Sequence, residues 1–139
     1  MEFYKSRVFD PNVLAKKLQL GSAGLMPTDT LPALISSVKH AHKLWRIKKR
    51  PLTKPLILMG ANPDVLFRSV LPAALEDAWE MSRKYWPGAL TLVLPTSGEM
   101  LNLLNHDSDS LGMRIPNCHM SIAFLKQTGP IATTSANVS

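Results

Sequence analysis

The chain has 139 residues, 45% of them hydrophobic and 19% charged, and a mean hydropathy of +0.02. A chain of this length and composition can bury a core by itself, which excludes a disordered segment. The formal net charge is +6, and the single cysteine, Cys118, excludes an internal disulfide. We therefore expect one domain over residues 1–139, in a reducing cytoplasm.

Helical and strand patterns alternate along the first part of the chain. Asp10 followed by Pro11 is typical of a helix start, and Gly21 is typical of a helix end. In chain order, the expected elements are a helix from 10 to 21, short strands at 24–26 and 34–38, a helix through 41–48 and a buried strand at 55–59.

The second part of the chain continues this alternation. Asn62 and Pro63 predict a helix that extends to Val70, and Pro72 predicts the start of a longer helix. The remaining expected elements are a turn at 86–88, a buried strand at 91–94, a helix at 100–104, a polar loop at 105–110, a strand at 112–115, a helix at 121–127 and a last strand at 131–134. This order predicts an α/β fold with a largely buried sheet.

The excess positive charge lies in one quarter of the chain. Between residues 30 and 63 there is no Asp or Glu, whereas the remainder holds nine cations and ten acids. The seven cations of this basic stretch are Lys39, Lys43, Arg46, Lys48, Lys49, Arg50 and Lys54. Such asymmetry favours an anionic partner, although a solvated basic surface is the simpler alternative.

Lys48, Arg50 and Lys54 are the strongest candidates for binding an anion. Pro51 and Pro55 restrict the backbone around them, so the charges are expected on a stiff turn. Arg offers a planar fork and Lys a compact charge, which suits a triphosphate or an RNA backbone. The glycine patterns of P-loop and Rossmann nucleotide sites are absent from the sequence, so side chains would hold a nucleotide to a greater extent.

Two polar segments follow expected strands. Thr28 and Thr30 flank an acid, and this group could bind a small polar ligand or orient a metal-bound water; a self-capped turn is the alternative. Thr133, Ser135 and Asn137 would share one face if the last strand continues. Ligands of open α/β sheets lie beyond the carboxyl ends of strands, although an ordinary polar turn would also explain this segment.

Other polar and aromatic residues carry weaker signals. Arg114 interrupts an apolar strand, so it must face solvent, a partner or a pocket. The four histidines lack the spacing of a zinc site, and we expect no metal held by the protein. Trp45, Trp79 and Trp86 are expected to pack in or around the core. Residues 1–7 show no leader-like apolar region, and no apolar run approaches the ~20 residues of a membrane span.

Taken in order, these motifs resemble those of the YrdC family, also called TsaC-like threonylcarbamoyl-AMP synthases. The matching segments are Pro27-Thr28-Asp29-Thr30, Lys48-x-Arg50-Pro51-x-x-Lys54-Pro55-Leu56, Trp86-Pro87-Gly88-Ala89-Leu90-Thr91, Met113-Arg114-Ile115-Pro116 and Thr134-Ser135-Ala136-Asn137-Val138-Ser139. The resemblance implies a twisted, open, mixed α/β sheet that is flanked by helices and surrounds a concave, basic cavity.

The resemblance also implies a reaction. Threonine and bicarbonate form a carbamate, which attacks the α-phosphate of ATP to give threonylcarbamoyl-AMP and pyrophosphate, assisted by Mg²⁺ that the nucleotide carries. The product feeds the N6-threonylcarbamoyladenosine modification of tRNA, so RNA and tRNA-modification proteins are expected partners.

The same resemblance assigns roles to the candidate residues. Thr28 and Thr30 are expected near threonine, and Lys48 and Arg50 are expected to be catalytic. The expected nucleotide- and phosphate-binding residues are Lys48, Arg50, Lys54, Arg114, Thr133, Ser135 and Asn137.

Two features depart from the family pattern. Family members continue the first motif with an apolar residue and Tyr-Gly-Leu, whereas this chain has Leu31-Pro32-Ala33-Leu34, which removes an aromatic hydroxyl from the expected amino-acid site. Family domains also continue for several tens of residues beyond the last motif, so we expect a single domain without the C-terminal part, and with an exposed or partner-covered sheet edge. A non-catalytic paralogue that binds RNA or nucleotide is therefore the alternative hypothesis.

Overall fold

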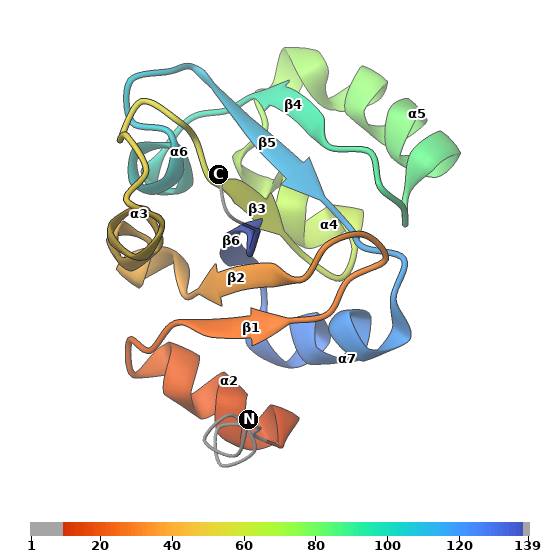
Figure 1. Cartoon of the computed structure of the whole chain (residues 1–139). Helices are drawn as coiled ribbons and strands as arrows, with labels where there is room; N and C mark the ends of the chain where they lie inside the picture. The colour runs from red at the N-terminus through yellow and green to blue at the C-terminus, as the bar shows by residue number, and fades with distance from the viewer. Residues whose placement is uncertain (1–9, 138–139) are drawn as a thin grey trace.

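The structure is a computed structural model that describes residues 10–137. Its centre is a six-stranded mixed sheet with the strand order β1-β2-β6-β3-β5-β4 (Figure 1). The strands are β1 (Gly24–Met26), β2 (Ala33–Ser36), β3 (Ile57–Met59), β4 (Leu92–Pro95), β5 (Ser110–Arg114) and β6 (Ile131–Ser135). Strands β3 and β5 are parallel, and all other neighbouring pairs are antiparallel.

Helices cover both faces of this sheet (Figure 1). The α-helices are α2 (Pro11–Gln19), α3 (His42–Lys48), α4 (Pro63–Leu66), α5 (Leu75–Tyr85), α6 (Glu99–Leu104) and α7 (His119–Thr128). Short 3₁₀ turns occur at Val38–His40, Phe67–Ser69 and Pro72–Ala74. None of the described helices is both long and apolar enough to cross a bilayer.

Strand alternation divides the apolar side chains between two cores. Leu58 of β3 belongs to the larger core, which also contains side chains from α3, α4, α5 and α6. Its neighbour Met59 points to the opposite face and belongs to a smaller core with Leu18 of α2 and Phe124 of α7. The smaller core fills only part of its face, because only α2 and α7 contribute helical side chains to it.

The expected α/β fold and most expected elements are confirmed. Asp10 caps α2, where its side chain accepts a hydrogen bond from the backbone N–H of Asn12, and Asn62 caps α4 in the same way through Val65. Trp45 and Trp86 are buried in the larger core, and Trp79 packs against it. The interpretations of residues 1–7 and of Val138 and Ser139 lie outside the described residues.

Several expected boundaries were wrong. The helix expected to reach Val70 ends at Leu66, because Val70 forms an isolated bridge with Thr96 after one 3₁₀ turn. The strand expected at 34–38 ends at Ser36, and the loop expected at 105–110 gives Ser110 to β5. The segment after Pro72 becomes α-helical only at Leu75.

The strand expected to be buried at 91–94 is instead the edge strand β4. Val93 is 67% exposed there, although its neighbour Leu92 is buried in the larger core. Pro95, which was expected to stop the strand, is its last residue. An edge strand tolerates proline because one side of its backbone has no strand to bond.

Cys118 occupies the N-cap position of α7, where its carbonyl accepts hydrogen bonds from the backbone N–H of Ile122 and the hydroxyl of Ser121. Hydrogen bonding from the Ser121 side chain is the main factor that lowers the pKa of the Cys118 thiol, followed by bonding from the Ser121 backbone. Burial and the negative charge of Asp29 oppose this effect. The thiol is therefore expected to ionise at a lower pH than an ordinary cysteine.

Two leucines in strands offer a matched test of the topology. Leu58 is 1% exposed in the central strand β3, and Leu25 is 61% exposed in the edge strand β1. We expect Leu58→Ala to lower the free energy of unfolding by about 2–5 kcal/mol, because it leaves a cavity in packed surroundings. Leu25→Ala should change it by less than about 0.5 kcal/mol. Urea titrations followed by circular dichroism measure both values, and equal losses would contradict the assigned strand order.

The pH dependence of Cys118 alkylation tests the start of α7. Since the thiolate is the nucleophile and the pKa of the Cys118 thiol is lowered, iodoacetamide should react with a pH midpoint below that of an ordinary cysteine. Ser121→Ala should move the midpoint upward. The same chain in concentrated urea is the control for an ordinary thiol, and the sequence contains no other cysteine to confuse the signal. A folded-state midpoint at or above the control value would contradict the assigned contacts.

Candidate functional site

A cavity of about 400 Å³ lies on the face of the sheet that α2 and α7 cover only in part. Its floor comes from one side of four neighbouring strands, because Ala33 pairs with Ser135, Ile57 pairs with Thr133, and Met59 pairs with Arg114. The walls are formed by Thr28, Thr30, Leu31, Arg50, Pro55, Thr91 and Thr134. The volume falls in the range of about 300–1,000 Å³ that is typical of small-molecule sites.

Gly112 shapes the floor beside β3. A Cβ atom at this position would lie 2.7 Å from Cδ1 of Ile57 and 3.1 Å from Cγ2 of Thr91. The missing side chain lets Ile57, a lining residue, lie over β5. A larger residue at 112 would push Ile57 toward the cavity.

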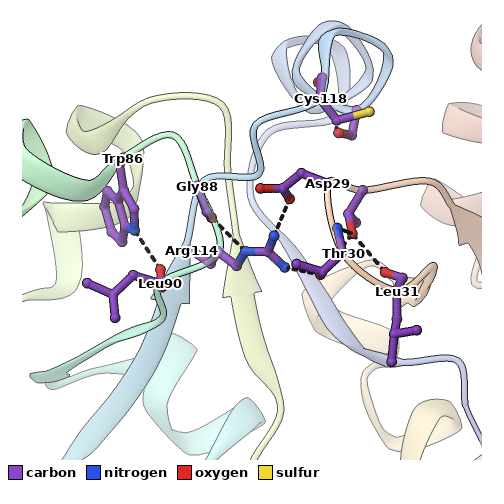
Figure 2. Close-up of polar contacts among 10 residues, drawn as sticks. Asp29, Thr30, Leu31, Trp86, Gly88, Leu90, Arg114 and Cys118 are labelled. Carbon is purple, nitrogen blue, oxygen red and sulfur yellow. Dashed lines mark hydrogen bonds and ion pairs between the residues drawn. The ribbon is translucent and has the colours of Figure 1, made fainter.

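Arg114 is buried at the end of β5 and holds three segments together (Figure 2). Its Nε donates to the carbonyl of Gly88 at 2.8 Å, and its Nη1 donates to Oγ1 of Thr30 at 3.1 Å. Its Nη2 forms an ion pair with Oδ1 of Asp29. Arg114 therefore lines the cavity with a guanidinium whose three kinds of nitrogen all have protein partners.

The turn that carries Thr28 and Thr30 is ordered by its own side chains. The Thr28 hydroxyl donates to the carbonyl of Leu31 at 2.7 Å and accepts from the backbone N–H of Thr30 at 3.0 Å. Since the single proton of Thr28 is used in this way, the 3.3 Å contact between the two hydroxyls has Thr30 as its donor. Both expected threonine-site residues thus line the cavity, on the loop between β1 and β2.

Arg50 is positioned by the end of α3. Lys49 adopts a left-handed conformation, with φ of 51°, and the backbone N–H of Arg50 then bonds to the carbonyl of Trp45. The guanidinium makes only long contacts of 3.4 Å, from Nη1 to Oγ1 of Thr134 and from Nη2 to the carbonyl of Pro55. Its Nε is buried and has no hydrogen-bond partner among the described residues. Arg50 is therefore poorly satisfied and points into a ligand-sized space.

The two lysines of the predicted anion site do not line this cavity. The Nζ atom of Lys48 donates to the backbone carbonyls of Ser135 and Asn137, the former at 3.0 Å. Lys54 is exposed, and its carbonyl accepts a hydrogen bond from the indole of Trp45. The structure brings only Arg50 of the three cations to the cavity.

Two of the three residues expected to share one face at the end of β6 lie in the cavity. Thr133 and Ser135 line the cavity, whereas the strand ends at Ser135, and Asn137 lies outside the lining. The hydroxyl of Thr133 donates to the carbonyl of Ile57 at 3.2 Å, and the hydroxyl of Ser135 donates to Oδ1 of Asn137. Asn137 therefore acts on the cavity through Ser135.

Sequence reasoning missed several residues of the site. The sequence indicates Asp29 as the acid of a possible ligand-binding turn, but not its pairing with Arg114, which depends on a contact across 85 residues. Thr91 and the apolar floor residues Ile57 and Met59 were treated as strand residues. The alternation of side chains along β3 predicts that Ile57 and Met59 face the side opposite to Leu58. The strand order that forms the cavity on that side cannot be predicted from local sequence.

The substituted segment Pro32-Ala33 is part of the site. Ala33 is buried and lies in the floor opposite Ser135. Pro32 is exposed, and its carbonyl accepts a hydrogen bond from the backbone N–H of Ala136 at 2.9 Å. These two residues thus join β2 to the end of β6, and Leu31 supplies an apolar wall beside them.

Comparison with known proteins places this arrangement in a family. The Sua5/YciO/YrdC family model, described as telomere recombination, matches residues 16–139. Threonylcarbamoyl-AMP synthase of Bacillus subtilis strain 168 is 31% identical over 137 residues, which cover 94% of this chain and 39% of that protein. Threonylcarbamoyl-AMP synthase of Yersinia enterocolitica is 37% identical over 105 residues, which cover 74% of this chain and 55% of that protein.

A solved structure shows the same fold. The crystal structure of Sua5 from Pyrococcus abyssi, complexed with L-threonine, matches with a TM-score of 0.84 and 27% identity, over 93% of this chain and 39% of that chain. This chain therefore spans about two fifths of the Bacillus and Pyrococcus proteins and about half of the Yersinia protein. The family match covers every residue that lines the cavity. On this evidence, and in agreement with the resemblance of its motifs, the chain belongs to the Sua5/YciO/YrdC family.

Proposed function

We propose that this chain binds ATP and threonine in the cavity and, with bicarbonate, forms threonylcarbamoyl-AMP for the N6-threonylcarbamoyladenosine modification of tRNA. The supporting observation is the composition of one cavity. It combines Arg50, whose guanidinium is poorly satisfied, with hydroxyls from the loop 27–32 and from β6. A cation and several hydrogen-bonding groups in one cavity suit a ligand with a phosphate and a polar head.

The proposed reaction has two steps. The amine of threonine condenses with bicarbonate to a carbamate, with loss of water. A carbamate oxygen then attacks the α-phosphorus of ATP, and the bond to the pyrophosphate group breaks. The protein's task is to hold two mutually repelling anions in contact and to neutralise developing charge, which is a matter of positioning and electrostatics.

Most of the predicted residues have a place in this proposal. Arg50 would bind phosphate, and Thr133 and Ser135 would hydrogen-bond the nucleotide. Thr28 and Thr30 would face threonine. The residues that do not line the cavity are proposed to act at its margin: Lys48 and Asn137 through Ser135, and Lys54 as an exposed cation beside Pro55.

The relatives support the type of enzyme and one substrate. The Bacillus and Yersinia proteins are named threonylcarbamoyl-AMP synthase, and the Pyrococcus structure contains L-threonine. Since this chain matches only part of each relative, we propose for it the same synthase type and the same amino acid. ATP and bicarbonate complete the chemistry that such a product requires.

Mg²⁺ is proposed to arrive with ATP. Within residues 10–137, no group of three or more His, Cys, Asp or Glu could hold a metal ion. Asp29, the acid between two lining threonines, is already paired with Arg114. Mg²⁺ commonly takes phosphates and waters as ligands, so the triphosphate suits it better than this cavity does. Bound there, the ion would neutralise phosphate charge.

A second candidate is binding of RNA or nucleotide without catalysis. Four cations of the basic stretch, Lys39, Arg46, Lys49 and Lys54, are exposed outside the cavity, where a phosphate backbone could reach them. The change at Pro32-Ala33 also places Ala33 in the floor of the cavity. Contacts with a phosphate backbone would make such binding strongly dependent on salt.

Arg50→Ala tests the nucleotide side of the cavity. We expect it to weaken binding of ATP with Mg²⁺ by about 10- to 100-fold, because a charge-assisted contact in a partly buried place is lost. Arg83→Ala, which removes the same charge from an exposed position on α5, should leave the affinity unchanged. Isothermal titration calorimetry measures both variants. Absence of a binding signal for the unmodified chain would contradict the nucleotide proposal.

Pyrophosphate release separates the two candidate functions. The purified chain with ATP, Mg²⁺, threonine and bicarbonate should release pyrophosphate, and omission of either threonine or bicarbonate should abolish the release. Radiolabelled threonine should appear in a product that also contains AMP. Binding of ATP or RNA without threonine-dependent release would support the non-catalytic alternative instead.

A further inference from the structure

Asp29 lies between Thr28 and Thr30, two residues of the cavity wall. It belongs to the loop between β1 and β2, and its carboxylate pairs with Arg114 at the end of β5 (Figure 2). The side chains of Arg114 and Asp29 are only 10% and 18% exposed. A buried guanidinium without a carboxylate partner is strongly unfavourable, so this pair constrains the loop.

The pair continues into an ordered chain of hydrogen bonds. Arg114 donates to Thr30, Thr30 donates to Thr28, and Thr28 donates to the carbonyl of Leu31. The direction of each bond is fixed, because Arg114 has only donors and each threonine has one proton. The orientation of the Thr30 hydroxyl therefore depends directly on where Asp29 holds Arg114, and the Thr28 hydroxyl is linked to Arg114 through Thr30.

We infer that Asp29 is a positioning residue of the cavity, which neutralises Arg114 and fixes the loop 27–32, and that Arg50 is the cation left to meet an anionic ligand. The contrast between the two arginines carries this inference. Arg114 has partners at Nε, Nη1 and Nη2, whereas Arg50 has two contacts of 3.4 Å and a buried Nε without a partner among the described residues.

If Asp29 competes with the ligand for Arg114, removal of its charge changes the ligand affinity in the opposite direction. If Arg114 bound the ligand directly, Asp29 would compete with the ligand, and removal of the Asp29 charge would tighten binding. If Asp29 positions the loop, removal of its charge leaves Arg114 free to move and disorders the hydroxyls of Thr28 and Thr30, so binding of threonine, which these hydroxyls are proposed to face, weakens. The sign of one substitution thus distinguishes the two roles.

Asp29→Asn is the variant to measure, with L-threonine as the probe. We expect affinity to fall by about 10-fold. Asp109→Asn, which removes the same charge from an exposed residue before β5, is the matched control and should not change it. Asp29→Glu keeps the charge and should recover most of the affinity. Unchanged or tighter binding by Asp29→Asn would overturn the inference.

Hydrogen exchange, measured without any ligand, keeps this test separate from the proposed function. Only the affinity measurement rests on the proposed function. The backbone N–H of Thr30 bonds to Oγ1 of Thr28, so its hydrogen exchange reports the order of the turn. We expect faster exchange in Asp29→Asn and no change in Asp109→Asn. Unchanged exchange in Asp29→Asn would overturn the positioning role even if threonine binds, and faster exchange would support it even if threonine does not.

Coupling between the paired residues gives a final check. In the positioning role, Asp29→Asn should add little to the effect of Arg114→Gln on exchange at Thr30, because the pair is already broken. Independent contributions would instead add, and additivity would contradict the inference. Circular dichroism of each variant confirms that the comparison is made between folded proteins.

Discussion

Unequal coverage of the two sheet faces is the constraint on which the site depends. A six-stranded sheet is about 24 Å wide, since neighbouring strands lie about 4.8 Å apart. Four helices contribute to the core on one face, whereas only α2 and α7 do so on the other. On that second face Ile57, Thr133 and Ser135 line the cavity and do not belong to the core. The uncovered part of the face becomes the floor of the cavity.

The charged side chains beside this floor have different tasks. The guanidinium of Arg114 bonds to Gly88, Thr30 and Asp29, and the ammonium group of Lys48 bonds to the backbone carbonyls of Ser135 and Asn137. Arg50 remains incompletely satisfied. The positive charge of the basic stretch is therefore an unreliable guide to the charge that a bound ligand would meet, because proximity in sequence does not decide which cation faces the cavity.

Much of the secondary structure follows from local sequence. Asp10 and Asn62 predict helix starts because they can act as N-caps, and apolar runs predict β1, β3 and β6. The order of the strands does not follow from local sequence, because β6 enters between β2 and β3. For the same reason, the sequence places Arg50 among candidates but cannot separate it from Lys48. That separation depends on the left-handed backbone at Lys49, which turns Arg50 away from the direction of α3.

The late position of β6 in the chain has a consequence for folding. Its registry joins Ala33 with Ser135 and Ile57 with Thr133, so the centre of the sheet is completed by the last described strand. Before β6 arrives, β1 and β2 have no bonded connection to β3, β4 and β5 within the described sheet. The loop that brings β6 to β2 is long, and closing it lowers the entropy of the chain before stabilising contacts form, which slows folding. Until then, strand edges remain unpaired during synthesis. Among the described strands, the cavity floor is therefore completed only when β6 pairs with β2 and β3.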